Sequence, residues 1–280
     1  MEKYSSHIKT ANISLLKILG SVILAGNRKE SLKKNMDVKM GKLAEKVFLN
    51  KRNPVSPTVR NGKKKLIAFG WYGGKFSHLD WILSLLPKCH HYCEPFAGSA
   101  AILLNRKPSP VETYNDLDGE VVNFFRVLRD NKDRLIEAIG LTPFSREEFE
   151  KACILDPNLD EIERARRFFV RARQVRTGLA QKASLGRWAN CKQTSRAGMS
   201  GVISRWLGSV ETLPDIAERF LRVQIENRPA IEIIRLYDSP DTLFYCDPPY
   251  VHSTSGDCSA YGNEMTDDDH RELASVVSHQ

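Results

Sequence analysis

In the middle of this 280-residue chain, short continuous apolar runs alternate with segments whose apolar residues recur at helical spacing. Short apolar runs predict strands at 89–96, 111–114 and 242–246, whereas apolar residues at helical spacing predict helices that open near Ser99 and cover 119–129. A strand–helix–strand–helix order is typical of a parallel α/β sheet with right-handed crossovers. The pattern therefore predicts a doubly wound α/β sheet.

About 100 residues separate the second of these helices from the strand at 242–246, and their composition differs. Residues 161–176 predict an amphipathic helix with one apolar face and arginines over much of the remainder. Phe168 and Phe169 lie on the apolar face, which favours core packing over base stacking. We interpret these residues as a mainly helical insertion in the sheet.

The two ends of the chain show different patterns. An apolar run at 13–25, interrupted by Lys17 and Ser21, is too short to cross a bilayer comfortably and lacks the flanks of a signal peptide. We interpret residues 1–65 as a basic extension and linker. At the other end, Thr266 predicts the N-cap of a helix that runs to the last residue, where a doubly wound sheet would normally continue with another strand.

Charge is distributed unevenly around the net value of +8. Residues 164–206 hold 11 Lys and Arg residues and no Asp or Glu, which predicts a surface that meets a phosphate backbone. A solvated basic face is the alternative. The candidate DNA-binding residues are Arg164, Arg167, Arg171, Arg173, Arg176, Arg187, Arg196 and Arg205.

Six cysteines are scattered along the chain and favour free thiols in a reducing cytoplasm. The one cluster, Cys89-His90-His91-Tyr92-Cys93, has no second ligand pair at the usual zinc spacing. We therefore predict ordinary packing there and no metal site.

The segment Asp247-Pro248-Pro249-Tyr250 follows the predicted strand at 242–246. Neither proline has a backbone N–H, so the loop presents acceptors at Asp247 and Pro248. An exocyclic amino group is a poor nucleophile because its lone pair is delocalised into the ring. Two acceptors would orient that lone pair and stabilise the positive charge that develops on nitrogen, while Tyr250 stacks on the base. A rigid turn with Tyr250 as packing is the alternative.

Three further segments predict a cofactor pocket. Trp71-Tyr72-Gly73-Gly74-Lys75 combines aromatics, a flexible turn and a cation, and Phe96 and Gly98 stand at a strand-to-helix switch. Asp116 ends the next strand, where an acid often binds ribose hydroxyls. No G-x-G-x-x-G motif occurs, which favours a nucleoside cofactor without phosphates, and S-adenosylmethionine is the obvious one.

Together these segments resemble the Dam-type DNA adenine-N6 methyltransferases. The resemblance covers roughly residues 66–280 and implies a Rossmann-like catalytic domain with an inserted target-recognition region. It implies that Trp71, Lys75, Phe96, Gly98 and Asp116 bind S-adenosylmethionine. It also implies that an adenine flipped out of double-stranded DNA is held by Asp247, Pro248, Pro249 and Tyr250.

The resemblance also sets the expected organisation. It divides the catalytic region into an S-adenosylmethionine-binding part at 66–140, a target-recognition insertion at 141–212 and a catalytic part at 213–280. The family often has a glycine where this chain has Ala100, and it continues beyond the helix at Thr266 with further strands that are missing here.

We expect a cytoplasmic monomer without a membrane span, acting alone or beside a partner restriction endonuclease. The alternatives are methylation of cytosine N4, an RNA base or a protein glutamine, or a truncated, inactive DNA-binding fragment.

Overall fold

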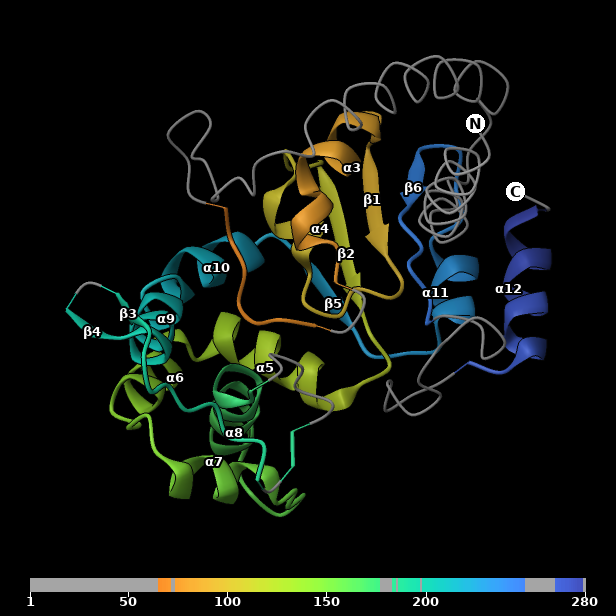
Figure 1. Ribbon diagram of the computed structural model, residues 1–280. Coiled ribbons are helices and arrows are strands. Elements are labelled where there is room, and N and C mark those ends of the chain that lie inside the picture. Colours follow the sequence, from red (N-terminus) through yellow and green to blue (C-terminus); the bar gives the residue numbers. More distant parts are fainter. Residues whose placement is uncertain are drawn as a thin grey trace, which may run out of the picture.

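The fold is built around a parallel sheet. A computed structural model describes residues 65–71, 74–176, 183–184, 186–196, 198–249 and 265–278, so the extension at 1–64 lies outside the described part. Four strands pair in the order β5-β2-β1-β6, and each pair is parallel (Figure 1). Their bounds are β1 His91–Glu94, β2 Val111–Asn115, β5 Gln224–Glu226 and β6 Thr242–Phe244.

Alternating side chains on the strands separate two hydrophobic layers, as the period of a strand requires. Tyr92 and Leu243 belong to the larger core, whereas Cys93 and Phe244, one position further on, belong to a second cluster. Cys246 and the helices α11 (Ala230–Leu236) and α12 (Asp267–Ser278) supply the other buried residues of that second cluster. Both faces of the sheet are therefore covered by helices, as the predicted doubly wound fold requires (Figure 1).

Side-chain caps explain where three helices begin. Helix α5 (Gly119–Asp130) starts after Asp118, whose carboxylate accepts the N–H of Glu120 at 2.9 Å. Helix α8 (Glu161–Gln174) starts after Asp160, which accepts two backbone N–H groups. Before α12, the hydroxyl of Thr266 accepts the N–H of Asp269 at 3.2 Å, as its predicted role as N-cap requires.

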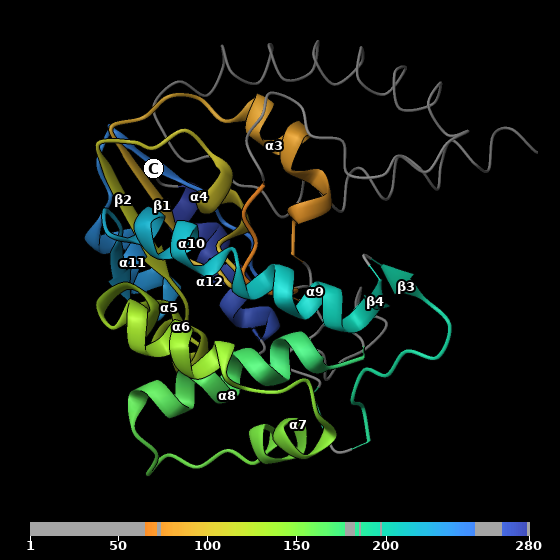
Figure 2. The same ribbon diagram turned by 90° about the vertical axis from the view of Figure 1, so that its left-hand side faces the viewer.

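The remaining elements surround this frame (Figures 1 and 2). No helix in the described ranges is long and apolar enough to span a membrane. The bounds are η1 Phe76–His78, α3 Leu79–Leu85, α4 Ala101–Asn105, α6 Lys132–Gly140, α7 Arg146–Cys153, α9 Gly201–Val210 and α10 Leu213–Phe220, with a two-stranded hairpin of β3 Ser195–Arg196 and β4 Met199–Ser200.

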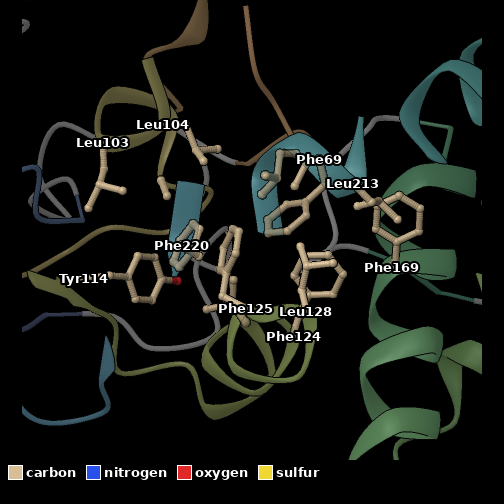
Figure 3. Close-up of a cluster of buried hydrophobic side chains, with 14 of the residues drawn as sticks. Phe69, Leu103, Leu104, Tyr114, Phe124, Phe125, Leu128, Phe169, Leu213 and Phe220 are labelled. Atoms are coloured by element: carbon tan, nitrogen blue, oxygen red, sulfur yellow. The ribbon is translucent and has the colours of Figure 1, made fainter. Parts of the chain in front are cut away.

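The region predicted as an insertion shares its core with the helices that flank the sheet. Phe124 of α5 stacks on Phe169 of α8 with ring centroids 5.6 Å apart, and Phe125 stacks on Phe220 of α10 at 4.5 Å (Figure 3). Phe168 and Phe169 are both buried, which confirms that they are core residues. Because aromatic rings from both regions interlock, α8 is held rigidly against the sheet-flanking helix α5.

The region between α5 and β6 is more than an insertion. Strand β5 lies within it and pairs with β2, with Tyr114 opposite Ile225. The chain returns to the sheet at β5 before α11 begins, so the roughly 100 residues before β6 are not one continuous insertion. The predicted insertion at 141–212 ends before β5 and stays a prediction. The prediction that further strands are missing after Thr266 stays a prediction.

Candidate active site

A cavity of about 260 Å³ lies at the carboxyl ends of β1 and β6. The strand order reverses between these two strands, since the chain runs outward from β1 through β2 to β5 and then returns to β6 on the other side of β1. Ligands of open α/β sheets bind at such a reversal. The predicted residues that line the cavity are Trp71, Lys75, Phe96, Gly98, Asp116, Asp247 and Pro249.

The turn after β1 forms one wall of the cavity and depends on Gly98. This residue has a left-handed backbone (φ 49°), and a Cβ built on it would lie 2.5 Å from the Trp71 indole. Its N–H donates to Asp116 at 2.7 Å, and its carbonyl accepts the Tyr114 hydroxyl at 2.9 Å. Only glycine combines this conformation with this close approach.

Ala100, where the family often has glycine, also has a left-handed backbone (φ 54°). Alanine adopts this conformation at a cost of about 1–2 kcal/mol. Ala100 nevertheless completes the turn, since its N–H donates to the Ala97 carbonyl at 2.8 Å, and its carbonyl accepts the N–H of Leu104 at the start of α4. The turn therefore keeps its form at this position without glycine.

Two polar residues at the end of β2 fix the loops around the cavity. The partly buried carboxylate of Asp116 accepts N–H groups from Gly98 and Asp118, and desolvation raises the pKa of Asp116 to about 6. The Asn115 amide donates to the carbonyls of Pro95 and Arg228 at 2.8 and 3.0 Å. Asn115 thus joins the loops that follow β1 and β5, a role that its place in the sequence motif did not reveal.

Lys75 contacts the predicted catalytic carboxylate directly. Its Nζ lies 2.6 and 2.5 Å from the two oxygens of Asp247, and the two side chains are only 7% and 16% exposed. Burial raises the pKa of Asp247, and the Lys75 ammonium opposes that rise. The sequence analysis expected Lys75 to bind the cofactor, whereas here its ammonium group contacts the chain's own Asp247.

Glu94 is a pocket residue that the sequence analysis did not select. It ends β1, lines the cavity and accepts the Tyr92 hydroxyl at 2.8 Å. Complete burial raises its pKa from 4.5 to about 8. The far wall was missed as well: residues 228–231, which end the connection from β5 and begin α11, line the cavity but show no recognisable motif.

The prolines and the flanking aromatics are placed only in part. Pro249 lines the cavity, while Pro248 is partly buried and lies outside the lining set. Tyr250, Tyr72 and Gly73 lie outside the residues that the structure describes. Trp71 packs within 5.8 Å of Phe69 and 6.4 Å of Phe168, measured between ring centroids, so α8 supports the indole at the cavity.

The predicted DNA-binding arginines fall into two groups. Arg164 and Arg171 form ion pairs with Glu120 of α5, and Arg167 forms one with Glu163. Carboxylates within the fold therefore already balance these three guanidinium groups, and their role in DNA binding stays a prediction. Within the described ranges no acid forms an ion pair with the other five, namely Arg173, Arg176, Arg187, Arg196 and Arg205.

The cysteine and histidine cluster at the start of β1 has protein partners. The Cys89 thiol lies 3.3 Å from the Ser109 hydroxyl, and His91 Nε2 lies 2.9 Å from Thr113 Oγ1. Cys93 is buried in the second hydrophobic cluster. Among the described residues no group of three His, Cys, Asp or Glu side chains is placed to hold a metal ion.

Comparison with known proteins agrees with this site. The chain is 34% identical over 120 residues to a type II methyltransferase of Lactococcus lactis subsp. cremoris, a match that spans 39% of this chain and 41% of that enzyme. It is 26% identical over 228 residues to a DNA adenine methylase of Vibrio cholerae serotype O1, spanning 77% and 76%. The family model for D12 class N6 adenine-specific DNA methyltransferases matches residues 71–280. The chain therefore belongs to this family, as its Dam-type motifs predicted.

Proposed function

We propose that this chain is a site-specific DNA methyltransferase that moves a methyl group from S-adenosylmethionine to the N6 amino group of adenine. The observation that supports this most strongly is the position of Asp247. Its carboxylate lines the same cavity as Trp71, Phe96 and Asp116, although it lies more than 100 residues after them in the sequence. The proposed base-binding and cofactor-binding residues therefore share one space.

The charges around the cavity fit the proposed cofactor. S-adenosylmethionine has a sulfonium and an ammonium group against one carboxylate, whereas a dinucleotide brings phosphates. The lining contains two basic side chains, Lys75 and Arg228, against four carboxylates: Asp116, Asp118, Asp247 and Asp269. Glu94 also lines the cavity, but its pKa of about 8 leaves it largely protonated near neutral pH. This excess of acids favours a cationic nucleoside over an anionic one.

Trp71, Phe96, Gly98 and Asp116 would hold the cofactor, which supplies the electrophilic methyl group when bound. Asp247 and the carbonyl of Pro248 would each accept one N–H of a flipped adenine. A carboxylate has about four acceptor sites, so Asp247 can keep its contact with Lys75 and still accept an amino proton. These two hydrogen bonds direct the nitrogen lone pair toward the methyl group and stabilise the positive charge that develops on nitrogen. The amino proton leaves after transfer, so no strong general base is needed.

Incubation of the full chain with radiolabelled S-adenosylmethionine and a panel of duplex DNA, RNA and protein substrates tests the proposal. Digestion of the DNA to nucleosides then identifies the modified base. We expect label in N6-methyladenine alone and in one sequence context. Label in N4-methylcytosine, RNA or protein, or no label with any substrate, would contradict the proposal.

A further inference from the structure

The proposed function assigns no role to Glu94, an acid of the cavity wall. This residue ends β1 and is only 2% exposed, yet it lines the cavity together with Asp247, which follows the paired strand β6. Adjacent strands lie about 4.8 Å apart, so side chains that follow β1 and β6 on one edge reach the same space. The Glu94 carboxyl group therefore belongs to the part of the cavity where the amino group of the base would lie.

The groups around Glu94 come from three strands and one helix. The Tyr92 hydroxyl donates to Glu94 at 2.8 Å, and the Arg106 guanidinium carbon lies 3.8 Å from the centre of the Tyr92 ring. Both groups favour the ionised form of Glu94, whereas burial and the charge of Asp247 oppose it. The titratable and charged groups that interact with Glu94 are Tyr92 and Cys93 of β1, Arg106 after α4, Tyr114 of β2 and Asp247 after β6.

The end of β1 does not require an acid for packing. A glutamine would accept the Tyr92 hydroxyl through its amide oxygen and would place no titratable proton in the wall. An ionised carboxyl group is unfavourable there because it loses its water, and burial accordingly raises the Glu94 pKa to about 8. Ionisation of Glu94 becomes favourable when a cation enters the cavity beside it.

S-adenosylmethionine would bring such a cation and lose it in the reaction. Its sulfur is positively charged before methyl transfer, whereas the sulfur of the product S-adenosylhomocysteine is neutral. The methyl group has to point at a nitrogen held by Asp247, so the sulfur bonded to it lies near the same acids. Lys75 already balances the charge of Asp247, whereas no cation among the described residues forms an ion pair with Glu94.

We propose that Glu94 is a further cofactor-binding residue: its carboxylate balances the sulfonium of S-adenosylmethionine, and its proton passes to the solvent as the cofactor binds. This inference rests on the proposed function and deepens it, because it explains how the cavity distinguishes the reactive cofactor from its product. Once the S–CH3 bond has broken, the sulfur is neutral and Glu94 takes up a proton from the solvent again. The product therefore loses an attraction that the cofactor had.

Proton release during cofactor binding tests this inference. Calorimetry of the full chain at pH 7.5, in two buffers of different ionisation enthalpy, counts the protons released as S-adenosylmethionine binds. If the carboxylate form binds the cofactor about tenfold more tightly than the protonated form, the wild type should release about half a proton more than Glu94→Gln. The wild-type affinity should then be about severalfold higher than that of Glu94→Gln at pH 8.5 and about equal to it at pH 6.

Two buried tyrosines supply matched variants. Tyr92→Phe removes the hydroxyl that stabilises the Glu94 carboxylate, so the affinity for S-adenosylmethionine should rise at a higher pH than in the wild type. Tyr114→Phe removes a hydroxyl that is bonded to the Gly98 carbonyl instead, and it should leave this pH unchanged. The comparison separates an effect on the Glu94 proton from the general effect of a lost buried hydroxyl.

The expected result is extra proton release by the wild type with S-adenosylmethionine and none with S-adenosylhomocysteine. Equal release by the wild type and Glu94→Gln, or the same extra release with both ligands, would overturn the inference. Methylation of adenine without this difference would overturn the inference and leave the proposed function intact. A chain that shows the difference but methylates no substrate would refute the proposed function alone.

Discussion

Replacement of Lys75 by methionine tests the ion pair at the centre of the cavity. The change keeps the length of the side chain but removes the ammonium group, which leaves the Asp247 carboxylate buried without this cation. Removal of one partner from a buried ion pair destabilises a protein by about 3–5 kcal/mol. Because Asp247 is still 16% exposed, we expect the lower end, about 3 kcal/mol at pH 8.

The loss should shrink as the pH falls. Burial already raises the pKa of Asp247, and without Lys75 it rises further, so the orphan carboxylate takes a proton more readily in the native state. Urea unfolding at pH 6 and pH 8 measures this difference. The double variant Lys75→Met/Asp247→Asn should be more stable at pH 8 than Lys75→Met alone, since no buried charge remains.

An exposed ion pair provides the control for this experiment. Lys151 pairs with Glu147 on the surface of α7, where the side chains are 51% and 78% exposed. Lys151→Met should therefore change the free energy of unfolding by less than about 1 kcal/mol. If Lys75→Met behaved like this control, or if the effects of Lys75→Met and Asp247→Asn simply added, the reasoning about a coupled buried pair would be refuted.

Three further changes test the walls of the cavity. Gly98→Ala forces a Cβ against Trp71 and should weaken S-adenosylmethionine binding by about tenfold or more in calorimetry, about 1.4 kcal/mol. The control Gly208→Ala, in open space on α9, should stabilise the fold by about 0.5–1 kcal/mol. An equal loss of S-adenosylmethionine affinity in the two variants would contradict this prediction. Because burial raises the Glu94 pKa to about 8, the native state binds this proton more tightly than the unfolded chain, and stability should fall as pH rises from about 4.5 to about 8. Glu94→Gln should reduce this dependence of the unfolding free energy on pH. An unchanged dependence would show that the Glu94 pKa is not raised in the native state. Asn115→Leu leaves two carbonyls and one N–H without their partner and should cost about 3 kcal/mol, measured by urea unfolding; a loss below 1 kcal/mol would contradict the bridging role.

The sequence predicted the elements whose signals are local. Helix α8 begins at Glu161 as predicted, because the Asp160 cap and the apolar face both belong to the same short stretch. Strands β1, β2 and β6 are short apolar runs, and α5 repeats its apolar residues at helical spacing. These elements place most of the predicted cavity residues, since the motifs follow directly after their strands.

Strand β5 could not be predicted in the same way. Gln224, Ile225 and Glu226 include one apolar side chain, and the strand is defined by its pairing with β2 more than 100 residues earlier. The loop that follows β5 and the first residues of α11 line the cavity through residues 228–231. Missing the strand therefore also meant missing one wall of the site.

The basic stretch shows a second limit of sequence reasoning. Residues 164–206 contain no acid, yet Arg164 and Arg171 are neutralised by Glu120, which lies on α5. A charge count along the chain does not include partners from another helix. Only the packing of α8 on α5 distinguishes these arginines from Arg173, whose guanidinium donates to the backbone carbonyl of Arg205 instead.

Single-turnover methylation by Asp247→Ala tests the central claim most directly. The full chain and the variant are mixed with duplex DNA and radiolabelled S-adenosylmethionine, and labelled N6-methyladenine is counted, while calorimetry and anisotropy report cofactor and DNA binding. We predict that transfer falls by about 10²–10³-fold, because the amino group loses its charged acceptor, while DNA binding persists. Transfer at the wild-type rate by Asp247→Ala would contradict the account.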